Sequence, residues 1–435
     1  MRCLAPDYVY TPQGMQHRML ISISNDGRII SVADFDSSSP VPSGTIEALP
    51  NTLLLPSFVN AHSHVFQRAL RGGTHRSLSA HDSFWTWRQA MYALANRLNP
   101  DHLYEVALHT YREMLVAGYA SVGEFHYLHH QPDGRPYANP NTMAEAVLSA
   151  GRDAGIRVVL LMTAYAQGGI NQVLEQGQQR FCDASVEAYL ARVDALRVAG
   201  VLVGVAPHSV RAVPESWLRP IADYSRTYAL PLHIHADEQR AEIEQCQQIY
   251  GCTPIELLKR YDVLGPLTSI IHATHANEVE IALLEREGCT VCVCPTTEAD
   301  LGDGIAPYTE LVAANIPLAI GSDSNTRLDP FEELRWAEYS ARMRYGRRRI
   351  LVCEKHASPG PFLLDMGTRR GANALGLETG VIAPGMLADF VAIDLNHPML
   401  QGWNVDDLLD ILFFGASSEV MKQIWVAGRK VPSCS

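Results

Sequence analysis

The middle of the chain alternates between short apolar runs and longer segments in which apolar residues recur at helical spacing. An apolar run of about four to eight residues is typical of a buried strand. A strand followed by an amphipathic helix predicts one βα unit of a parallel sheet. Eight such units predict a (β/α)8 barrel of the TIM type. The runs cover residues 53–59, 120–125, 158–162, 201–206, 232–235, 269–272, 290–294 and 318–320.

The two ends of the chain have a different pattern, with short alternating runs separated by turns. Residues 19–23 alternate and are followed by the turn residues Asn25, Asp26 and Gly27, while 388–393 and 423–428 are typical of strands near the C-terminus. We therefore predict an α/β protein in which residues 1–52 and 378–435 together form a small β-sandwich domain. Residues 53–377 would form the barrel. A doubly wound open sheet is the alternative, but no predicted strand leads into a G-x-G-x-x-G turn.

Histidines and acidic residues follow several of the predicted barrel strands. His62 and His64 follow the first run, His235 ends the fifth, and Asp323 follows the eighth. Active-site groups of such barrels lie where the strands end. Side chains at i and i+2 of an extended backbone point to the same face, so His62 and His64 can converge on one ion.

These four residues could surround one divalent metal ion. Nitrogen and oxygen ligands without a thiolate suit zinc, and they also allow iron or manganese. An ion held in this way would activate a water molecule for hydrolysis. Cys292 and Cys294 alternate in an apolar run and are better explained as small core residues of a strand.

Composition excludes several other classes of protein. Hydrophobic residues make up 47% and charged residues 19% of the chain, and the net charge is −12. This balance argues against a nucleic-acid or anionic-membrane partner, and the basic run 342–349 is predicted to be a solvated helix end. Nine scattered cysteines, the lack of a signal-like N-terminus and the lack of a long apolar run favour a cytoplasmic protein.

The H-x-H of His62 and His64, the later histidines and Asp323 resemble the signature of the amidohydrolase superfamily, and the resemblance extends over nearly the whole chain. Many members hold two metal ions bridged by a carboxylated lysine after the fourth barrel strand. The first lysine here is Lys259, after the fifth run, so that bridge cannot be built. Residues 235–238 are instead similar to the H-x-x-E of the one-metal deaminases. The resemblance therefore implies one divalent ion per subunit, with Zn²⁺ expected.

The resemblance also implies catalytic roles. In the one-metal deaminases the glutamate of H-x-x-E moves a proton to the leaving nitrogen, which assigns that role to Glu238. His272 is the expected companion base or electrophile, and Asp323 would both bind the metal and accept a proton. Asp237 stays an alternative to Glu238, and His275 an alternative to His272.

Longer strings narrow the resemblance to the members that hydrolyse a formimino group on a small amino-acid derivative with two carboxylates. The resemblance implies substrate-binding roles for Gln67, Arg88, Tyr127, His208 and Arg211. An arginine can bind a carboxylate through two charge-assisted hydrogen bonds, and a dianion requires such cations. The alternative for Arg88 is a surface arginine stacked on a neighbouring tryptophan. The strings are residues 62–68, 84–88, 124–130, 295–304 and 321–324.

Two other functions remain open on the sequence. A one-metal deaminase of a purine- or pyrimidine-type ring would stack its substrate on aromatic side chains. A catalytically silent barrel that serves as a scaffold would usually have lost metal ligands, whereas every ligand position is filled here. The family likeness also suggests a homodimer. The apolar segment 408–414 would then lie either in that interface or between the β domain and the barrel.

Overall fold

Eight parallel strands form the centre of the molecule in the computed structural model, which describes residues 1–35, 45–75, 83–352 and 358–432. They lie side by side in chain order, and each predicted apolar run overlaps one of them. This arrangement confirms the predicted barrel. The strands are β6 (Phe58–Ser63), β7 (Tyr119–His126), β8 (Arg157–Ala164), β9 (Val203–Pro207), β10 (Leu232–Ala236), β11 (Thr268–His272), β12 (Thr290–Val293) and β13 (Leu318–Ile320).

The last strand meets the first through the backbone of residues beyond its end. The amide of Asp323 donates to the carbonyl of His62 at 3.0 Å, and the amide of His64 donates to the carbonyl of Asp323 at 2.9 Å. These hydrogen bonds join β6 to the segment after β13. The backbone that closes the barrel therefore also carries three of the four predicted metal ligands.

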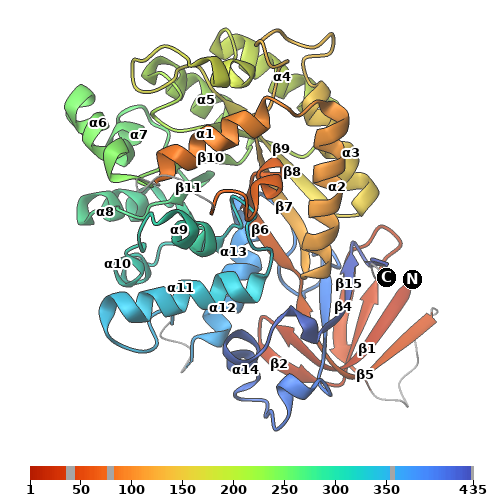
Figure 1. Cartoon of the computed structure of the whole chain (residues 1–435). Helices are drawn as coiled ribbons and strands as arrows, with labels where there is room; N and C mark the ends of the chain where they lie inside the picture. The colour runs from red at the N-terminus through yellow and green to blue at the C-terminus, as the bar shows by residue number, and fades with distance from the viewer. Residues whose placement is uncertain (36–44, 76–82, 353–357, 433–435) are drawn as a thin grey trace.

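Helices surround the barrel and connect its strands (Figure 1). Several begin at side chains that cap the helix: the Asn99 side chain accepts from the His102 amide, and Asn277 accepts from the amides of Val279 and Glu280. The helices are α1 (Phe84–Ala95), α2 (Pro100–Val116), α3 (Thr142–Ala154), α4 (Val186–Val198), α5 (Glu215–Tyr228), α6 (Arg240–Tyr250), α7 (Pro254–Arg260), α8 (Glu278–Glu287), α9 (Pro295–Leu301), α10 (Tyr308–Ala313), α11 (Pro330–Tyr345), α12 (Gly360–Gly367), α13 (Arg369–Ala374) and α14 (Leu408–Gly415).

Strands from both ends of the chain form a second, mixed sheet, at the lower right of Figure 1 where both termini lie. Its order is β16-β15-β14-β5-β1-β3-β4, with β2 paired to β1. The strands expected to form a sandwich are thus joined in one hydrogen-bonded sheet, whose own core includes Leu4, Ile21, Phe390 and Trp425. The strands are β1 (Arg2–Thr11), β2 (Gly14–His17), β3 (Met19–Ile23), β4 (Ile29–Asp34), β5 (Thr45–Pro56), β14 (Phe390–Asp394), β15 (Met421–Val426) and β16 (Arg429–Lys430).

The first apolar run divides between the two sheets. Leu53, Leu54 and Leu55 lie in β5, where they pair with residues of β14, and the barrel strand begins only at Phe58. The predicted domain boundary between residues 52 and 53 therefore falls inside β5. The run is continuous in the sequence because both strands are buried around Ser57, so hydrophobicity does not mark where the chain leaves one sheet for the other.

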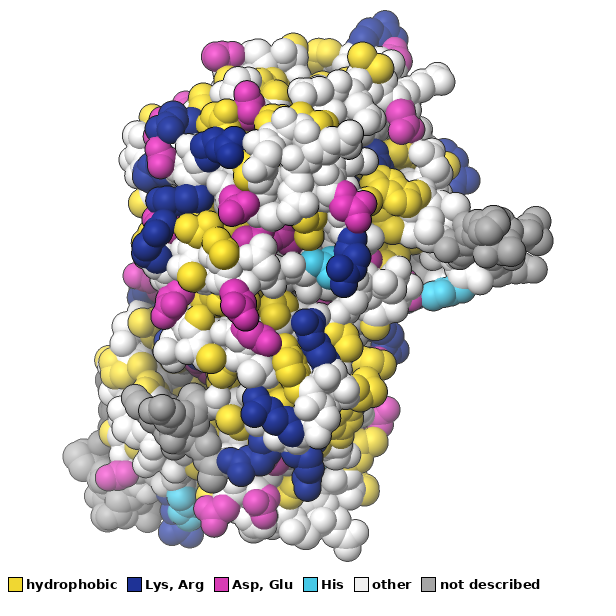
Figure 2. All heavy atoms as spheres, turned by 90° about the vertical axis from the view of Figure 1, so that its left-hand side faces the viewer, with side chains coloured by type: hydrophobic (Ala, Val, Ile, Leu, Met, Phe, Trp, Pro, Cys, Tyr) yellow, Lys and Arg dark blue, Asp and Glu magenta, His cyan; other side chains and the backbone are white. Residues whose placement is uncertain are grey.

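Helix α14 contains the apolar segment 408–414, which the sequence assigned either to a dimer interface or to the contact between the β domain and the barrel. Its Leu408, Leu412 and Phe413 are buried, and the Phe413 ring lies 5.4 Å from that of Phe331 on α11. The segment therefore packs against the barrel helices in the single chain. Figure 2 shows acidic and basic side chains mixed over one face of the molecule. Among the helices described, none has the length and apolarity that crossing a bilayer requires.

Candidate metal centre and active site

Four predicted ligands converge at the carboxyl ends of the barrel strands. The Nε2 atom of His62 lies 3.2 Å from the Nε2 atoms of both His64 and His235. The Oδ1 atom of Asp323 lies 3.4 Å from Nε2 of His62 and 3.2 Å from Nε2 of His64. Ligand atoms around a tetrahedral zinc ion with bonds of about 2.0–2.1 Å are about 3.3 Å apart. The spacing of the four side chains fits such an ion.

The protonation of the histidines also fits a metal. His64 Nδ1 lies 3.0 Å from the carbonyl oxygen of Phe125, and His235 Nδ1 lies 2.9 Å from that of His208. A carbonyl only accepts, so Nδ1 carries the proton in each ring and Nε2 presents its lone pair to the ion. Burial lowers the pKa of His62 to about 3 and that of His235 well below its usual range. Both imidazoles are therefore neutral, which is the form that binds metals.

Asp323 divides its two carboxylate oxygens between different neighbours. Its Oδ1 faces the histidines, whereas Oδ2 lies 3.9 Å from Nε2 of His272. Although burial opposes ionisation, the imidazoles of His62 and His64 hold the pKa of Asp323 well below its usual range. The carboxylate is therefore ionised, and its Oδ2 atom stays available to a group other than His62 and His64.

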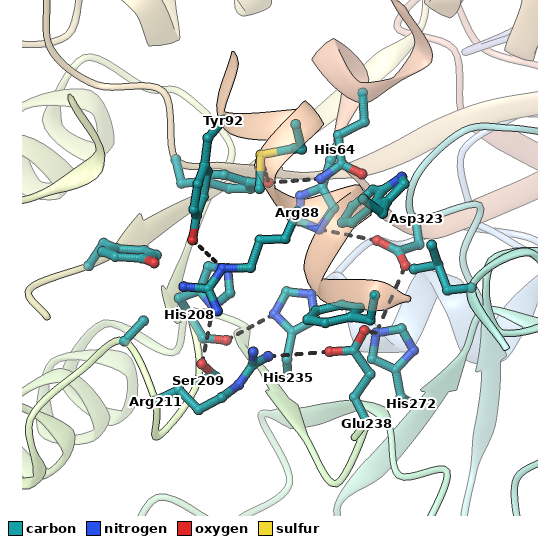
Figure 3. A pocket seen from close by; sticks show the side chains of 18 of the residues that line it. His64, Arg88, Tyr92, His208, Ser209, Arg211, His235, Glu238, His272 and Asp323 are labelled. Carbon is teal, nitrogen blue, oxygen red and sulfur yellow. Dashed lines mark hydrogen bonds and ion pairs between the residues drawn. The ribbon is translucent and has the colours of Figure 1, made fainter. Parts of the chain in front are cut away.

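Glu238 and His272 face the same space beside the four-residue group (Figure 3). The Oε1 atom of Glu238 lies 3.9 Å from Nε2 of His272. Burial disfavours the charged imidazole, but Glu238, Glu298 and Asp323 outweigh that effect and raise the pKa of His272 to about 10. His272 thus carries a proton beside a carboxylate, an arrangement suited to proton transfer.

The two alternatives to these residues lie elsewhere. Asp237 is buried outside the cleft. Burial and the nearby carboxylate of Glu280 raise the pKa of Asp237 well above its usual range. His275 is half-buried and is not among the residues that line the cleft. Of each pair of candidates, the structure turns Glu238 and His272 toward the cleft.

A cleft with a cavity volume of about 60 Å³ lies beside these groups. All five residues predicted to bind the substrate line it, namely Gln67, Arg88, Tyr127, His208 and Arg211. Figure 3 shows the Arg88 side chain reaching between Tyr92 and His208.

Contacts within the protein orient several of these side chains. Arg88 donates from Nε to the Tyr92 hydroxyl and from Nη2 to the carbonyl of Gly168 at 3.2 Å. Its guanidinium also lies 5.3 Å from the ring of Trp85, as the stacking alternative predicts, and its role in substrate binding stays a prediction. The hydroxyl of Tyr127 accepts from Gln67 Nε2 at 2.8 Å.

Two acidic residues that support the site received no role from the sequence. Glu298 Oε1 accepts from the Cys294 amide at 2.8 Å and lies 3.2 Å from His272 Nδ1. Glu124 accepts from the Val65 amide at 2.7 Å, next to His64, and burial raises the pKa of Glu124 to about 8. Both lie in strings that resemble the family. Glu124 lies at the end of a predicted strand, so the positional argument that singled out His272 could have found it. Glu298 lies beyond a predicted strand, on helix α9, where that argument does not reach.

The fold and these groups define a metal-dependent hydrolase built on a (β/α)8 barrel. The amidohydrolase family model matches residues 53–431. The chain is 36% identical to formimidoylglutamate deiminase of Pseudomonas aeruginosa, over 99% of this chain and 94% of that protein. It belongs to the amidohydrolase family and is an enzyme that hydrolyses carbon–nitrogen bonds.

Other relatives are deaminases or share the fold. An 8-oxoguanine deaminase of Pseudomonas aeruginosa is 28% identical over 87% of this chain and 83% of that protein. An amidohydrolase from Brucella melitensis has a similar structure, with a TM-score of 0.88 and 33% identity over 99% of this chain and 94% of that one. An adenosine deaminase from Xanthomonas campestris, solved with bound zinc, has a TM-score of 0.82 and 22% identity over 99% and 92% of the two chains.

Proposed function

We propose that this enzyme hydrolyses N-formimino-L-glutamate to N-formyl-L-glutamate and ammonia. One zinc ion per subunit would be held by His62, His64, His235 and Asp323. The observation that carries the proposal is a cleft lined both by two arginines, Arg88 and Arg211, and by three of the four metal-binding candidates, His64, His235 and Asp323. A substrate with two carboxylates supplies an anion for each guanidinium. The 36% identity to a formimidoylglutamate deiminase supports the same substrate.

When bound, the metal ion brings the pKa of a coordinated water close to neutrality, so that hydroxide is available for attack on the formimino carbon. Glu238 lies next to the four ligands without being one of them, and it can take the proton of that water and pass it to the leaving nitrogen. His272 is held at Nδ1 by Glu298, so the proton on its Nε2 faces the same space. That proton stabilises negative charge that develops there during the reaction.

The walls of the cleft would bind the glutamate part of the substrate. Arg88 and Arg211 would each bind one carboxylate, and Tyr127, Gln67 and His208 would donate or accept further hydrogen bonds. The Oε1 atom of Gln67 is buried and has no hydrogen-bond partner among the described residues, so it is available to a donor on the substrate. The polar groups of the cleft are thus complementary to a small polar dianion.

Ammonia release from purified enzyme tests this function. The enzyme is loaded with zinc, its metal stoichiometry is measured, and N-formimino-L-glutamate is compared with 8-oxoguanine and adenosine. We expect one zinc per subunit and a kcat/KM for N-formimino-L-glutamate at least about 100-fold above that for either purine compound. Turnover of a purine without turnover of N-formimino-L-glutamate would reject the substrate and keep the reaction class. Two zinc ions per subunit would reject the one-metal site.

A deaminase of a purine-type ring is the second candidate. Aromatic residues Phe84, Trp87, Tyr92 and Tyr165 line the cleft, and such rings can stack on a base. The 28% identity to an 8-oxoguanine deaminase points the same way. Arg211 already has the carboxylates of Glu238 and Glu242 beside it, but a neutral base would leave Arg88 without an anion among the described residues, which favours an anionic substrate. A non-catalytic scaffold is the weakest candidate, because the ligand side chains are all present and converge.

A further inference from the structure

Arg211 is held from two directions by carboxylates that belong to different parts of the site. Its Nε atom donates to Glu242 Oε1 at 3.2 Å, and its Nη2 atom donates to Glu238 Oε2 at 3.3 Å. Glu238 lines the cleft, as Figure 3 shows, whereas Glu242 lies behind Arg211 on the first turn of α6 and is not part of the lining. Glu242 therefore contacts the arginine without a direct path to a substrate.

The geometry of these two contacts determines which edge of the guanidinium stays free. A guanidinium binds a carboxylate in two-point fashion through either its Nε and Nη2 side or its Nη1 and Nη2 end. Glu242 occupies Nε, and Glu238 takes one of the two hydrogens of Nη2. No described residue accepts a hydrogen bond from Nη1, so Nη1 and the other hydrogen of Nη2 are left for the carboxylate of a bound molecule.

The burial of the Glu242 carboxylate has a free-energy cost, which a functional role of its charge would account for. Its side chain is fully buried, and Oε2 accepts no hydrogen bond from any described residue. A buried carboxylate with an unpaired oxygen lowers stability. Without the charge of Glu242, Glu238 would be the only anionic partner of Arg211 among the described residues, and the two would form a closer pair. That pair would turn the guanidinium away from a substrate and engage the group that must transfer the proton.

We propose that Glu242 is a positioning residue that holds Arg211 with its Nη1 and Nη2 edge toward the cleft, for one carboxylate of the substrate. By sharing Arg211, it also keeps Glu238 from becoming locked in an ion pair. The inference rests on the proposed function only in that the substrate carries a carboxylate at this position. It extends the set of residues that select an anionic substrate beyond those that line the cleft.

The variant Glu242→Gln tests the role of the charge, because it keeps the shape of the side chain and one oxygen that can accept from Nε. We expect KM for N-formimino-L-glutamate to rise about tenfold or more. We also expect kcat to fall for every substrate, because Glu238 is then drawn into a closer pair with Arg211. Two analogues each lack one charge: N-formimino-L-glutamine and N-formimino-γ-aminobutyrate. For the analogue without the carboxylate that Arg211 binds, the wild type and the variant should have the same KM. The matched control is Glu244→Gln, an exposed residue on the same helix.

A general loss of structure would raise KM equally for all three substrates, and that result overturns the proposal, as does no change with any of them. Should Glu242→Gln fail to fold, Glu242→Asp keeps the charge but shortens the side chain, and a smaller, equally selective rise in KM is expected.

Calorimetric binding of glutarate separates this proposal from the proposed function. Wild type that binds glutarate at least about tenfold more tightly than Glu242→Gln supports it even if no ammonia is released. Equal affinity rejects it.

Discussion

Replacing Glu238 with glutamine would separate metal binding from proton transfer. Glu238 is not among the four converging ligands, and its nearest polar partners are Arg211 at 3.3 Å and His272 at 3.9 Å. Glutamine has nearly the same size and keeps an oxygen that can accept from Arg211. The variant therefore loses the ability to carry a proton but retains the four ligands and the shape of the cleft.

The size of the effect follows from the role of the group. A positioned acid or base contributes about 10²–10⁴-fold to the rate. We therefore expect kcat of Glu238→Gln to fall by about that factor, which corresponds to about 3–5 kcal/mol in the activation barrier. Zinc content per subunit should stay at the wild-type value, because no ligand has changed.

The neighbouring carboxyl group provides a matched control. Burial and the nearby carboxylate of Glu280 raise the pKa of Asp237 well above its usual range, and Asp237→Asn keeps the size and shape of this side chain while removing its ionisable proton. We expect its kcat to stay within about threefold of wild type if it takes no part in proton transfer. The assay is ammonia release at saturating substrate, together with zinc content and melting temperature. Wild-type turnover in Glu238→Gln, or a large loss in Asp237→Asn with metal and fold intact, would refute the assignment.

Three further predictions concern the metal and stability. Chelation should abolish ammonia release and lower Tm, and zinc should restore both, because the ion holds four buried side chains together; activity independent of metal would contradict this. Burial lowers the pKa of His233 from 6.5 to about 4, so between these pH values the unfolded chain binds a proton that the folded chain does not. The contribution of His233 to the free energy of unfolding should therefore decrease by about 3 kcal/mol as the pH falls from 6.5 to 4. In urea unfolding, His233→Gln should lose that part of the pH dependence, and an unchanged pH profile would contradict the assignment. In the same assay, Asp389→Asn should lower the free energy of unfolding by about 3 kcal/mol, because it leaves Arg157 of β8 without its buried carboxylate partner. A decrease below about 1 kcal/mol would show that this ion pair contributes little to stability.

Much of the candidate site could be read from the sequence because its residues have local signatures. A polar residue directly after a buried strand is recognisable without a structure, and parallel strands bring all such residues to one end of a barrel. His62, His235 and Asp323 come together for this reason, although they are far apart in the chain. Glu298 and Glu242 have no such signature, since each is one of several acidic residues on an amphipathic segment. Their partners, His272 and Arg211, are contributed by other βα units.

The sequence by itself determined the barrel, the joining of both ends of the chain in one small β domain and the set of groups able to bind a metal. Each of these follows from local hydrophobic patterning and from the order of the strands. Only the tertiary structure decided which side chains turn into the cleft. Asp237, His272 and Asp323 have φ angles of 56°, 73° and 43°. Such left-handed residues break the two-residue alternation of a strand. The direction of the next side chain therefore depends on backbone angles that the packed barrel imposes, and no periodicity in the sequence records them.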